Sequence, residues 1–513
     1  MHLHELLAGT EIREMPSANP EISGISHDSR RVEPGDLYVA IQGARFDGRE
    51  FAPQAVSRGA VAVLGRGGAP RIEAPWIETE DPRRLLGPLA ARLFGEPHDR
   101  LRLIGITGTN GKSTVTALVA RMLEAAGQPT GIVGTLGYRL GERAFDDLLV
   151  ASGVRTTPEA TDLFRTLRAM ADEGAAAVAM EVSSHAMGMG RVSGARFDVG
   201  VFTNLSHDHL DYHGTMEDYF EAKCRLFEQL KPGGKAVVNR DDPWGRRLAE
   251  RLDDVVTFDD AGDVRVLAAD LDPRGIRARL ATPRGELAVT SPLLGRFNLL
   301  NLLAVVAVGE ALELPHEAMR EGLAAQRPLP GRLEPIDVGQ RFPVLVDYAH
   351  TPAALEAALG SLRELGDHRL IVVFGCGGDR DRDKREPMGE IVGRFSDLAI
   401  ATSDNPRGED PRAILDAVAR GLESSGQRDY VLEPDRRTAI RRAVATACGD
   451  ERAMVLVAGK GHEQEQVIGD RRLPFCDREE LEMALRLCLD GRLGDGLRDA
   501  GSAIATGGLH GRP

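Results

Sequence analysis

The sequence predicts an α/β protein of three domains, and three observations support this prediction. The chain has 513 residues, enough for about three domains of roughly 100–200 residues each. Apolar runs typical of buried strands alternate with helical segments, which favours mostly parallel sheets. Two stretches, 94–102 and 327–335, interrupt this alternation and read as boundaries. We therefore expect domains at residues 1–98, 99–333 and 334–492, and a disordered Gly-rich tail at 493–513.

Apolar runs place the expected strands of each domain. In the first domain they lie at 36–41 and 60–65. In the second, a buried strand at 101–108 precedes an amphipathic helix at 113–127 that Gly127 closes, and further strands lie at 175–182, 197–205 and 235–239. In the third, the expected strands lie at 342–349, 369–378, 397–405 and 453–461, with helices between them.

Composition and charge narrow the range of functions. The net charge is −14, so a general nucleic-acid or anionic-membrane surface is not expected. Acids interrupt the first fourteen residues, and no apolar stretch approaches the length of a membrane span, so we expect neither a signal peptide nor membrane insertion. The cysteines are odd in number, scattered and without metal spacing, which suits a reducing cytoplasm: Cys224, Cys376, Cys448, Cys476 and Cys488.

The segment GITGTNGKSTV, residues 105–115, joins an expected strand to an expected helix and is suited to phosphate binding. Backbone N–H groups and the positive end of the helix would face the anion. Lys112 can reach the β- and γ-phosphates, and the hydroxyl of Ser113 or Thr114 can bind Mg²⁺. The segment departs from the usual Walker A spacing, because Ile106 stands where the first glycine belongs. An ordinary Gly-rich turn is the alternative, and a phosphate site alone permits an ATPase, a kinase, a GTPase or a ligase.

Acidic and histidine residues follow the next two expected strands. Glu181 ends one of them, where α/β sheets bind ligands, so it is a candidate Mg²⁺ ligand or else a solvated acid. His207, His209 and His213 lie in an expected loop, and zinc is one interpretation of them, although they lack the helical spacing usual for hydrolytic zinc sites. On the residues alone, Lys223 on the following helix reads as a surface lysine.

Taken together, these segments resemble the Mur ligase family, and within it the branch that adds meso-diaminopimelate in peptidoglycan synthesis. The resemblance covers nearly the whole chain, and TGTNGK[ST] is the loop variant of this family and of the folylpolyglutamate synthases. It rests on the segments Gly108–Thr114, Met180–His185, His207–Gly214 with Ala222 and Lys223, Gly331–Glu334, Asp347–His350, 375–385, 403–410 and 458–463. It implies a small N-terminal α/β UDP-binding domain, a central P-loop ATPase domain with a mostly parallel sheet, and a C-terminal Rossmann-like domain that binds the amino acid.

The resemblance also implies the chemistry. ATP would phosphorylate a substrate carboxylate, and an amine would then displace phosphate to form an amide. Lys112, Glu181, His209 and Lys223 would be the catalytic residues. Two Mg²⁺ ions would be held, one by Ser113 and Glu181 and one by His209 and Lys223, the latter converted by CO₂ to a carbamate (N6-carboxylysine). ATP would contact Gly108, Thr109, Asn110, Gly111, Lys112, Ser113, Thr114, Asn301, Arg332 and Asp347, with His350 nearby.

The substrate contacts that the resemblance implies fall into two groups. UDP-MurNAc-L-Ala-D-Glu would contact Ser29, Ala44, Arg45, Phe46, Arg155, Thr156, Thr157, Ser183, Met189 and Arg191. Arg155 and Met189 depart from the Asn and Gln often found at these positions, which leaves these two contacts open. Diaminopimelate would contact Arg380, Asp404, Asn405, Pro406, Arg407, Gly459 and Glu463. Arg407 in Asp-Asn-Pro-Arg can hold the distal carboxylate in a bidentate fork, and Glu463 would pair with the distal ammonium.

The expected function is therefore ATP-dependent addition of meso-diaminopimelate to UDP-MurNAc-L-Ala-D-Glu by a cytoplasmic monomer with small-molecule substrates, no nucleic-acid partner and no membrane insertion. The alternatives are a lysine-adding ligase of the same family, a folylpolyglutamate synthase, and a regulatory module that only hydrolyses ATP. The last has no need for Glu181, His209, Lys223 and Arg407 together.

Overall fold

The computed structural model describes residues 1–43, 46–148 and 155–493. It divides into two compact units, one formed by Met1–Pro292 with Asn298–Gln326 and the other by Leu293–Phe297 with Arg327–Pro513. Ala44, Arg45 and the expected disordered tail from residue 494 onward lie outside the described residues. The three predicted domain boundaries stay a prediction.

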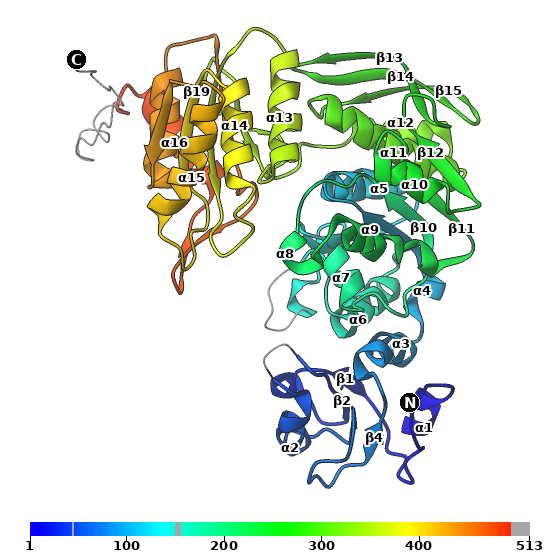
Figure 1. Cartoon of the computed structure of the whole chain (residues 1–513). Coiled ribbons are helices and arrows are strands. Elements are labelled where there is room, and N and C mark those ends of the chain that lie inside the picture. The colour runs from blue at the N-terminus through cyan, green and yellow to red at the C-terminus, as the bar shows by residue number, and fades with distance from the viewer. Residues whose placement is uncertain (44–45, 149–154, 494–513) are drawn as a thin grey trace. The chain divides into compact units, whose positions relative to one another are not determined.

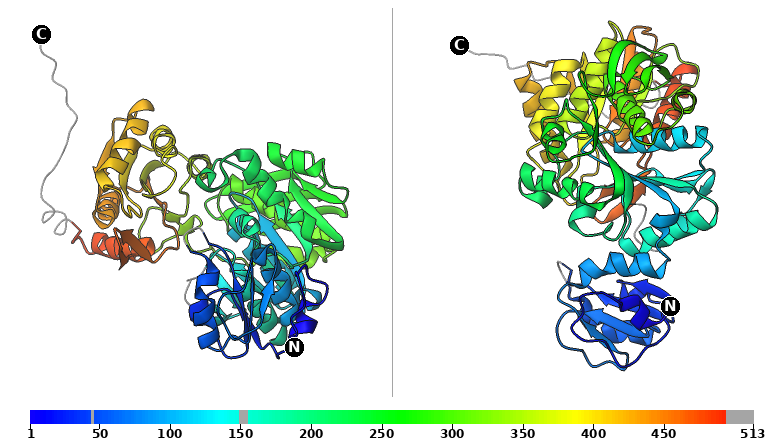
Figure 2. Two further views of the ribbon diagram at one scale, coloured as in Figure 1. Left: turned by 60° about the horizontal axis from the view of Figure 1, so that its bottom comes forward. Right: turned by 90° about the vertical axis from the view of Figure 1, so that its right-hand side faces the viewer.

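A parallel four-stranded sheet opens the first unit, in the order β1 (Gly24–Ser26), β2 (Asp36–Ala40), β3 (Ala62–Gly65), β4 (Trp76–Glu78). Its strands are short, and one face packs against α1 and α3 while α2 covers the other. Helix α3 lies between this sheet and the central part of the unit, where it packs against α6 (Figure 2). The helical elements here are α1 (Leu3–Leu7), η1 (Ser29–Arg31), η2 (Gly48–Phe51), α2 (Ala52–Ser57), α3 (Pro82–Leu93) and α4 (Pro97–Arg100).

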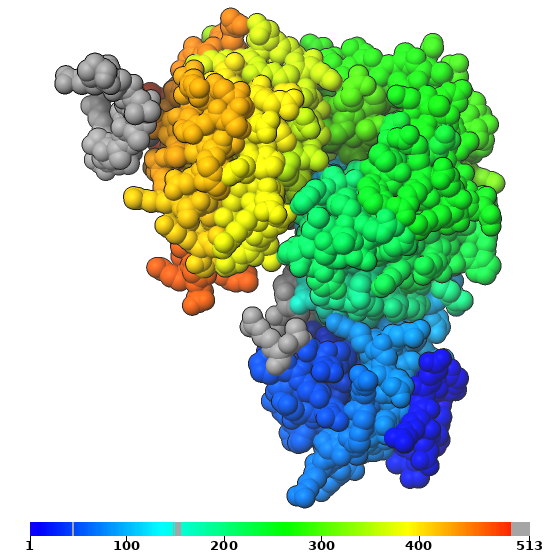
Figure 3. Space-filling model, in the orientation of Figure 1, coloured from blue at the N-terminus to red at the C-terminus, as the bar shows by residue number. Residues whose placement is uncertain are grey.

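An eight-stranded sheet forms the centre of the first unit, in the order β12-β11-β10-β5-β9-β6-β7-β8. The pairs from β12 to β6 are parallel, as predicted, whereas β7 and β8 continue the edge antiparallel. In the space-filling view, the light-blue surface around α3 meets the cyan and green surface of this segment (Figure 3). The strands are β5 (Arg102–Thr107), β6 (Thr130–Gly134), β7 (Gly137–Leu140), β8 (Arg143–Ala144), β9 (Ala177–Glu181), β10 (Phe197–Phe202), β11 (Leu230–Asn239) and β12 (Val255–Phe258).

Helices of the central segment connect these strands. The predicted helix after the phosphate loop is α5, and Gly127 adopts a left-handed φ of 75° just beyond its end, as expected for a helix-closing glycine. The helices are η3 (Asp146–Leu148), α5 (Lys112–Ala125), α6 (Ala160–Asp172), α7 (Ser184–Gly188), α8 (Leu210–His213), α9 (Met216–Cys224), η4 (Phe227–Gln229) and α10 (Pro243–Ala249). Helix α8 occupies a stretch that the sequence predicted as loop.

A three-stranded antiparallel sheet follows, made of β13 (Arg265–Asp272), β14 (Gly275–Thr282) and β15 (Gly285–Ser291) (Figure 1). This sheet was not predicted from the sequence, although the alternating burial of β14 and β15 is the period-2 pattern of a half-buried strand. Helices α11 (Arg296–Ala311) and α12 (His316–Ala324) come next, and α12 packs against both α5 and β15.

The second unit contains a six-stranded sheet in the order β16-β17-β21-β18-β19-β20, parallel except for the short edge strand β16. Helices α13, α14 and α15 cover one face, and α16 and α17 cover the other (Figure 1). Helices on both faces of a mostly parallel sheet are the arrangement expected of a Rossmann-like domain. The strands are β16 (Glu334–Pro335), β17 (Val344–Asp347), β18 (Arg369–Cys376), β19 (Leu398–Ser403), β20 (Tyr430–Glu433), β21 (Ala453–Ala458), and the hairpin β22 (Glu465–Ile468) with β23 (Arg471–Pro474).

The remaining helices are α13 (Pro352–Glu364), α14 (Arg385–Phe395), α15 (Pro411–Ser424), α16 (Arg436–Ala447) and α17 (Asp477–Leu489). A disulfide between Cys448 and Cys488 joins the ends of α16 and α17. The cysteine pattern did not predict this pair, because 40 residues separate the two in sequence and only the packing of α17 on α16 brings them together. Among the described residues, no helix combines the length and apolarity that a bilayer crossing requires.

Candidate active site

The phosphate loop, Gly108–Thr114, connects the carboxyl end of β5 to the first turn of α5. Two of its glycines are required by the packing around them. Gly108 has φ 147°, and a Cβ there would lie 1.9 Å from the Oγ1 of Thr203. Gly111 has φ 86°, and its Cβ would lie 2.5 Å from the Oδ1 of Asn301. The variant loop therefore fits closely against the end of β10 and against α11, and Asn301 lies beside it.

The end of β10 holds the phosphate loop in shape. The Asn204 carbonyl accepts from the Thr109 amide at 2.8 Å, and its side-chain Oδ1 accepts from the Asn110 amide at 2.9 Å. Thr203 donates to the Asn110 carbonyl at 2.6 Å. These bonds fix the loop backbone without a ligand, which reduces the ordering cost of binding one.

Two lysines converge on one carbonyl of this loop. The Nζ of Lys112 donates to the Gly108 carbonyl at 3.0 Å, and the Nζ of Lys223 donates to the same oxygen at 2.8 Å. Lys223 is 1% exposed on α9, and its Nζ lies 4.5 Å from the centre of the Tyr219 ring. Burial, and then the neighbouring Lys112 ammonium, lower the pKa of Lys223 well below its ordinary value. The interpretation of Lys223 as a surface lysine is therefore wrong.

Glu181 lies next to the phosphate loop because β9 pairs with β5, with Glu181 opposite Ile106. Its side chain is 2% exposed. One carboxylate oxygen accepts from the Thr135 amide at 2.9 Å and the other from the Thr135 hydroxyl at 3.2 Å. Ser113 is buried in the first turn of α5. The interpretation of Glu181 as a solvated acid is therefore wrong.

Histidines cluster on α7 and α8 near this edge of the sheet. His209 caps the start of α8 with φ 55°, and its ring lies 4.7 Å from that of His185. Burial lowers the pKa of His209, with the nearby Asp208 acting in the opposite direction. A lowered pKa favours the neutral ring, whose unprotonated nitrogen can bind a cation. The described residues contain no group of three or more His, Cys, Asp or Glu placed to hold a metal ion, so the zinc interpretation gains no support.

The predicted dipeptide-binding residues of the central segment lie together. The Thr157 hydroxyl donates to the Glu181 carbonyl at 2.7 Å and accepts from the Ser183 amide at 3.0 Å. Thr156 and Thr135 share a hydroxyl hydrogen bond of 3.0 Å. Arg191 donates to the Thr157 carbonyl at 3.2 Å and contacts the Met189 sulfur at 3.2 Å. The set therefore adjoins Glu181 and, through it, the phosphate loop.

A cavity of about 710 Å³ extends from this set toward the first sheet, and its lining includes Ser29, Phe46 and Arg155. Glu159, also in the lining, makes ion pairs with Arg155 at 2.7 Å, Arg191 at 2.9 Å and Arg83 at 3.1 Å. Burial tends to raise the pKa of Glu159, but the arginines and His27 outweigh it and hold the pKa below its usual value. Three guanidinium groups around one carboxylate leave the site positive, which suits an anionic substrate.

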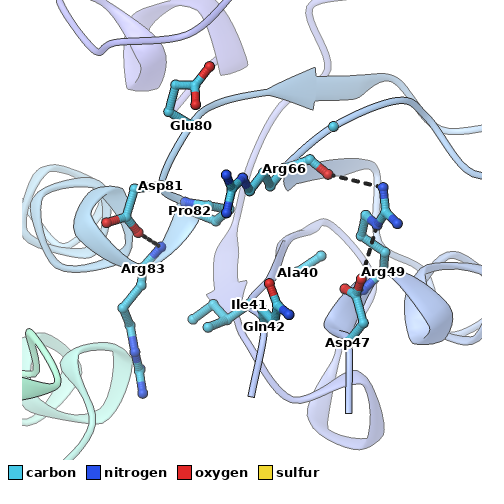
Figure 4. A pocket seen from close by; sticks show the side chains of 11 residues that line it. Ala40, Ile41, Gln42, Asp47, Arg49, Arg66, Glu80, Asp81, Pro82 and Arg83 are labelled. Atoms are coloured by element: carbon cyan, nitrogen blue, oxygen red, sulfur yellow. Dashed lines mark hydrogen bonds and ion pairs between the residues drawn. The ribbon is translucent and has the colours of Figure 1, made fainter. Parts of the chain in front are cut away.

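A second cavity of about 540 Å³ lies on the other side of the segment that follows β2 (Figure 4). Ile41 of this segment lines both cavities. The lining of the second cavity carries charges of both signs: Arg49 contacts Asp47 at 3.2 Å and donates to the Arg66 carbonyl, while the Asp81 carboxylate caps α3. The mixed charges give this cavity no clear preference for a ligand.

In the second unit, predicted diaminopimelate-binding residues follow the carboxyl ends of β19 and β21. Asn405 donates to a Glu463 carboxylate oxygen at 2.9 Å. Arg407 has φ 53°, and its Nη1 donates to the Gly378 carbonyl at 2.8 Å. A Cβ on Gly377 would lie 2.9 Å from that Nη1 and 3.8 Å from a carboxylate oxygen of Asp404, so the two side chains border the same glycine. Pro406 continues this loop, Gly459 follows β21 with φ 115°, and Arg380 lies exposed in the loop after β18.

Two predicted nucleotide-binding residues also lie in the second unit. Asp347 ends β17, and its carboxylate accepts from the amides of Ala349 at 2.8 Å and Leu333 at 2.7 Å. Burial raises the pKa of Asp347, with the nearby Arg332 guanidinium acting against it. Arg332 lies 4.7 Å from the centre of the Tyr348 ring. The predicted nucleotide-binding residues therefore fall into two sets, one in each unit.

Comparison with known proteins agrees with this arrangement. The profile of the Mur ligase middle domain matches residues 106–309, that of the Mur ligase glutamate ligase domain matches 331–461, and that of the Mur ligase family catalytic domain matches 21–93. A relative from Geobacter metallireducens, a UDP-N-acetylmuramoyl-L-alanyl-D-glutamate–2,6-diaminopimelate ligase, is 46% identical over 91% of this chain and 94% of its own.

The chain belongs to the Mur ligase family.

A second relative of the same name, from Streptomyces coelicolor, is 46% identical over 92% of this chain and 94% of its own. A solved structure of a ligase with this name is 33% identical, with a TM-score of 0.67, and the match covers 95% of this chain and 99% of that one. A folylpolyglutamate synthase from Mycobacterium tuberculosis shares the fold, at 24% identity and a TM-score of 0.59 over 72% of this chain and 91% of its own.

Three further groups of this Mur ligase were not singled out from the sequence. Arg436 and Asp477 form a fully buried bidentate ion pair, and Arg436 also donates to the carbonyls of Ala458 and Ser403, which end β21 and β19. Lys460 is buried among the loops predicted to bind the amino acid. Lys460 lies inside segment 458–463, which carries the family resemblance, and Glu159 lies two residues after Thr157, so nearness to these residues is the signal that could have found both. Nothing in the sequence pairs Arg436 with Asp477, 41 residues away.

Proposed function

We propose that this Mur ligase uses ATP to join meso-2,6-diaminopimelate to the γ-carboxylate of the D-glutamate in UDP-MurNAc-L-Ala-D-Glu, as a cytoplasmic step of peptidoglycan precursor synthesis. The relatives from Geobacter metallireducens and Streptomyces coelicolor, which match over nine-tenths of the chain, carry the name of this activity. Monomeric state stays a prediction.

The observation that carries the choice of amino acid is the position of Arg407. Its guanidinium and the carboxylate of Asp404 border Gly377 together, and Asn405 and Glu463 are hydrogen-bonded beside them. The distal end of diaminopimelate carries a carboxylate and an ammonium on one carbon. A guanidinium next to carboxylates is complementary to that pair, because Arg binds carboxylate in a fork and the acids bind the ammonium. Arg380, Pro406 and Gly459 would complete the contacts around the amino acid.

ATP would bind the phosphate loop, with Lys112 and the loop amides on the phosphates and Asn301 beside Gly111. Asp347 and Arg332 of the second unit would contact the ribose and the phosphates. The residues around the loop fit a Mg²⁺ ion: Glu181 is a buried carboxylate that forms no ion pair among the described residues, and Ser113 adds a hydroxyl. When bound, Mg²⁺ would neutralise negative charge on the phosphates.

Lys223 would serve as a carbamate rather than as an ammonium. A buried amine whose Nζ meets a carbonyl and a tyrosine ring is poorly placed to carry a positive charge. Reaction of the neutral amine with CO₂ forms an N–C bond and releases one proton, leaving an anionic carboxylate on the lysine. With His209 it would supply the ligands of a second Mg²⁺ beside the loop.

The geometry accounts for the roles of this chain in the reaction. Arg191, Thr156, Thr157 and Ser183 would hold the dipeptide end of the nucleotide substrate next to Glu181, and Ser29, Phe46 and Arg155 would hold its UDP-sugar part in the 710 Å³ cavity. The D-glutamate carboxylate oxygen then attacks the γ-phosphorus, ADP leaves, and the amine of diaminopimelate displaces phosphate. Lys112 stabilises the charge that moves between the phosphates.

Phosphate release tests the proposal. We expect release from ATP only when both UDP-MurNAc-L-Ala-D-Glu and meso-diaminopimelate are present. Release from ATP alone would indicate the regulatory ATPase, and equal turnover with L-lysine would indicate the lysine-adding ligase. Release with a folate substrate and glutamate would indicate a folylpolyglutamate synthase.

A further inference from the structure

Lys460 places a buried positive charge inside the predicted amino-acid site. Its side chain is fully buried. The Nζ donates to a carboxylate oxygen of Glu463 at 2.8 Å and to the Oδ1 of Asn405 at 3.2 Å, and it lies 3.7 Å from a carboxylate oxygen of Asp404. All three partners are residues expected to contact diaminopimelate. We call Asp404, Asn405, Arg407, Lys460 and Glu463 the head-group site.

One carboxylate oxygen next to Lys460 accepts no hydrogen bond from the described residues. This oxygen belongs to Asp404, faces Lys460 and is buried. Glu463 is 31% exposed, so its carboxylate is reachable from outside. An unused buried acceptor beside a reachable carboxylate is a place for a further donor, and a substrate ammonium supplies one.

The net charge of the head-group site can be compared with that of the amino acid it would bind. Asp404 and Glu463 contribute two negative charges, and Lys460 and Arg407 contribute two positive ones, so the site is neutral. Arg436 lies behind it, but Asp477 balances that charge. The distal end of diaminopimelate, with one ammonium and one carboxylate, is also neutral. The side chain of lysine carries a single positive charge and fits best a site with one negative charge more than this one.

We propose that Lys460 is a specificity-determining residue, whose fixed positive charge makes the head-group site neutral and so favours the zwitterionic end of diaminopimelate over the cationic side chain of lysine. This inference rests on the proposed function, because it concerns the same amino-acid site. Arg407 supplies the direct contact to the distal carboxylate. Lys460 acts through the charge balance and through the position of the Glu463 carboxylate that it binds.

The test is Lys460→Met, which keeps a similar side-chain length without the charge. The variant and the wild type are assayed by phosphate release with saturating ATP and UDP-MurNAc-L-Ala-D-Glu, titrating meso-diaminopimelate or L-lysine. We expect kcat/KM for diaminopimelate to fall at least tenfold, mainly through KM. We expect the ratio of kcat/KM for diaminopimelate to that for lysine to fall at least tenfold as well, with KM for ATP and for the nucleotide substrate within twofold of wild type.

Lys235→Met is the matched control. It makes the same change in a surface lysine that pairs with Asp254 on the first unit, and the amino-acid ratio should stay unchanged. An unchanged ratio in Lys460→Met, or an equal loss with both amino acids, would overturn the inference and leave Lys460 as a purely structural residue.

If Lys460→Met is insoluble, the same substitution can be tested in a protein that already carries Glu463→Gln. In Glu463→Gln the site gains one net positive charge, so the ratio should move further toward diaminopimelate relative to lysine. Adding Lys460→Met to it removes the partner of the missing carboxylate and should move the ratio back by at least tenfold. No shift between these two variants would equally overturn the inference. Failure of the proposed function is distinguishable, because the wild type itself would then not use diaminopimelate.

Discussion

Lys223 and Lys460 are both buried lysines, one in each unit, yet their neighbours give them opposite properties. Lys223 meets a backbone carbonyl, an aromatic ring and a second lysine, and its pKa is lowered well below the ordinary value. Lys460 meets the carboxylates of Glu463 and Asp404. Burial of an amine alone therefore does not say what it does, because the groups packed against it differ: a carbonyl, a ring and a lysine at Lys223, and carboxylates at Lys460.

The two surroundings also differ in how they are built. The phosphate loop is one contiguous stretch, braced by the end of the neighbouring strand β10. The head-group site gathers residues from the loops after β19 and β21 and rests on the buried Arg436–Asp477 pair. We expect charges at the phosphate loop to act on the rate of the chemical step, and charges at the head-group site to act on the choice of amino acid.

The largest effect expected is that of Lys112→Met. Removing a cation that stabilises charge on the transferred phosphate should lower kcat for ligation about 1000-fold, with little change in KM for diaminopimelate. Steady-state phosphate release measures both parameters, and Lys235→Met again serves as the control. A variant that retains kcat but has a raised KM for diaminopimelate would contradict the expectation that the phosphate loop acts on rate and the head-group site on the choice of amino acid.

Lys223→Ala should come next, with a fall in kcat of at least about 100-fold, because it removes both the amine and the carbamate formed on it. We expect short carboxylates such as acetate or formate to restore part of the activity, since they can occupy the vacated space as anions. Circular dichroism checks the fold of the variant. If the folded variant gains nothing from added carboxylates, the carbamate assignment fails.

Arg407→Ala should have a smaller and selective effect. Loss of a charge-assisted contact to the distal carboxylate should lower kcat/KM for diaminopimelate about 30-fold, equivalent to ~2 kcal/mol, while kcat/KM for lysine changes little. Competition between the two amino acids in one reaction gives the ratio directly. Equal losses for both would show that Arg407 supports its loop, through the bond to the Gly378 carbonyl, rather than the substrate.

The smallest effect expected is that of Arg155→Asn, which introduces the residue common in the family. The side chain of Arg155 is 39% exposed in its ion pair with Glu159. Arg83 and Arg191 also pair with Glu159 and would remain in the variant. We expect KM for UDP-MurNAc-L-Ala-D-Glu to change less than about threefold. A change of tenfold or more in that KM would instead make Arg155 a direct ligand of the substrate.

Much of the fold was predictable from the sequence because it depends on local pattern. The strands of the parallel sheets appear as apolar runs, and the phosphate loop appears as glycines followed by Lys-Ser at a helix start. The three-stranded antiparallel sheet β13–β15 was not predicted, because its strands are half exposed and alternate polar with apolar residues instead of forming continuous apolar runs. The Cys448–Cys488 disulfide was missed because nothing local links two residues on different helices.

The site was predictable where its residues form motifs, and not where they meet only in space. Thr156, Thr157, Ser183 and Arg191 were expected from the family resemblance, and the structure gathers them beside Glu181. Lys223 was expected to lie on the surface because lysine side chains are rarely buried, yet it lies among the buried residues of α9. The partners of Lys460 and Arg436 come from separate loops and helices, so only the fold shows which charges balance.

The central claim is the identity of the amino acid that the enzyme adds. The most direct test incubates the enzyme with ATP, Mg²⁺, UDP-MurNAc-L-Ala-D-Glu and equal concentrations of meso-diaminopimelate and L-lysine. Mass spectrometry then identifies and quantifies the two possible products. The account predicts that the diaminopimelate product predominates. A product mixture in which the lysine adduct is equal or greater would contradict it.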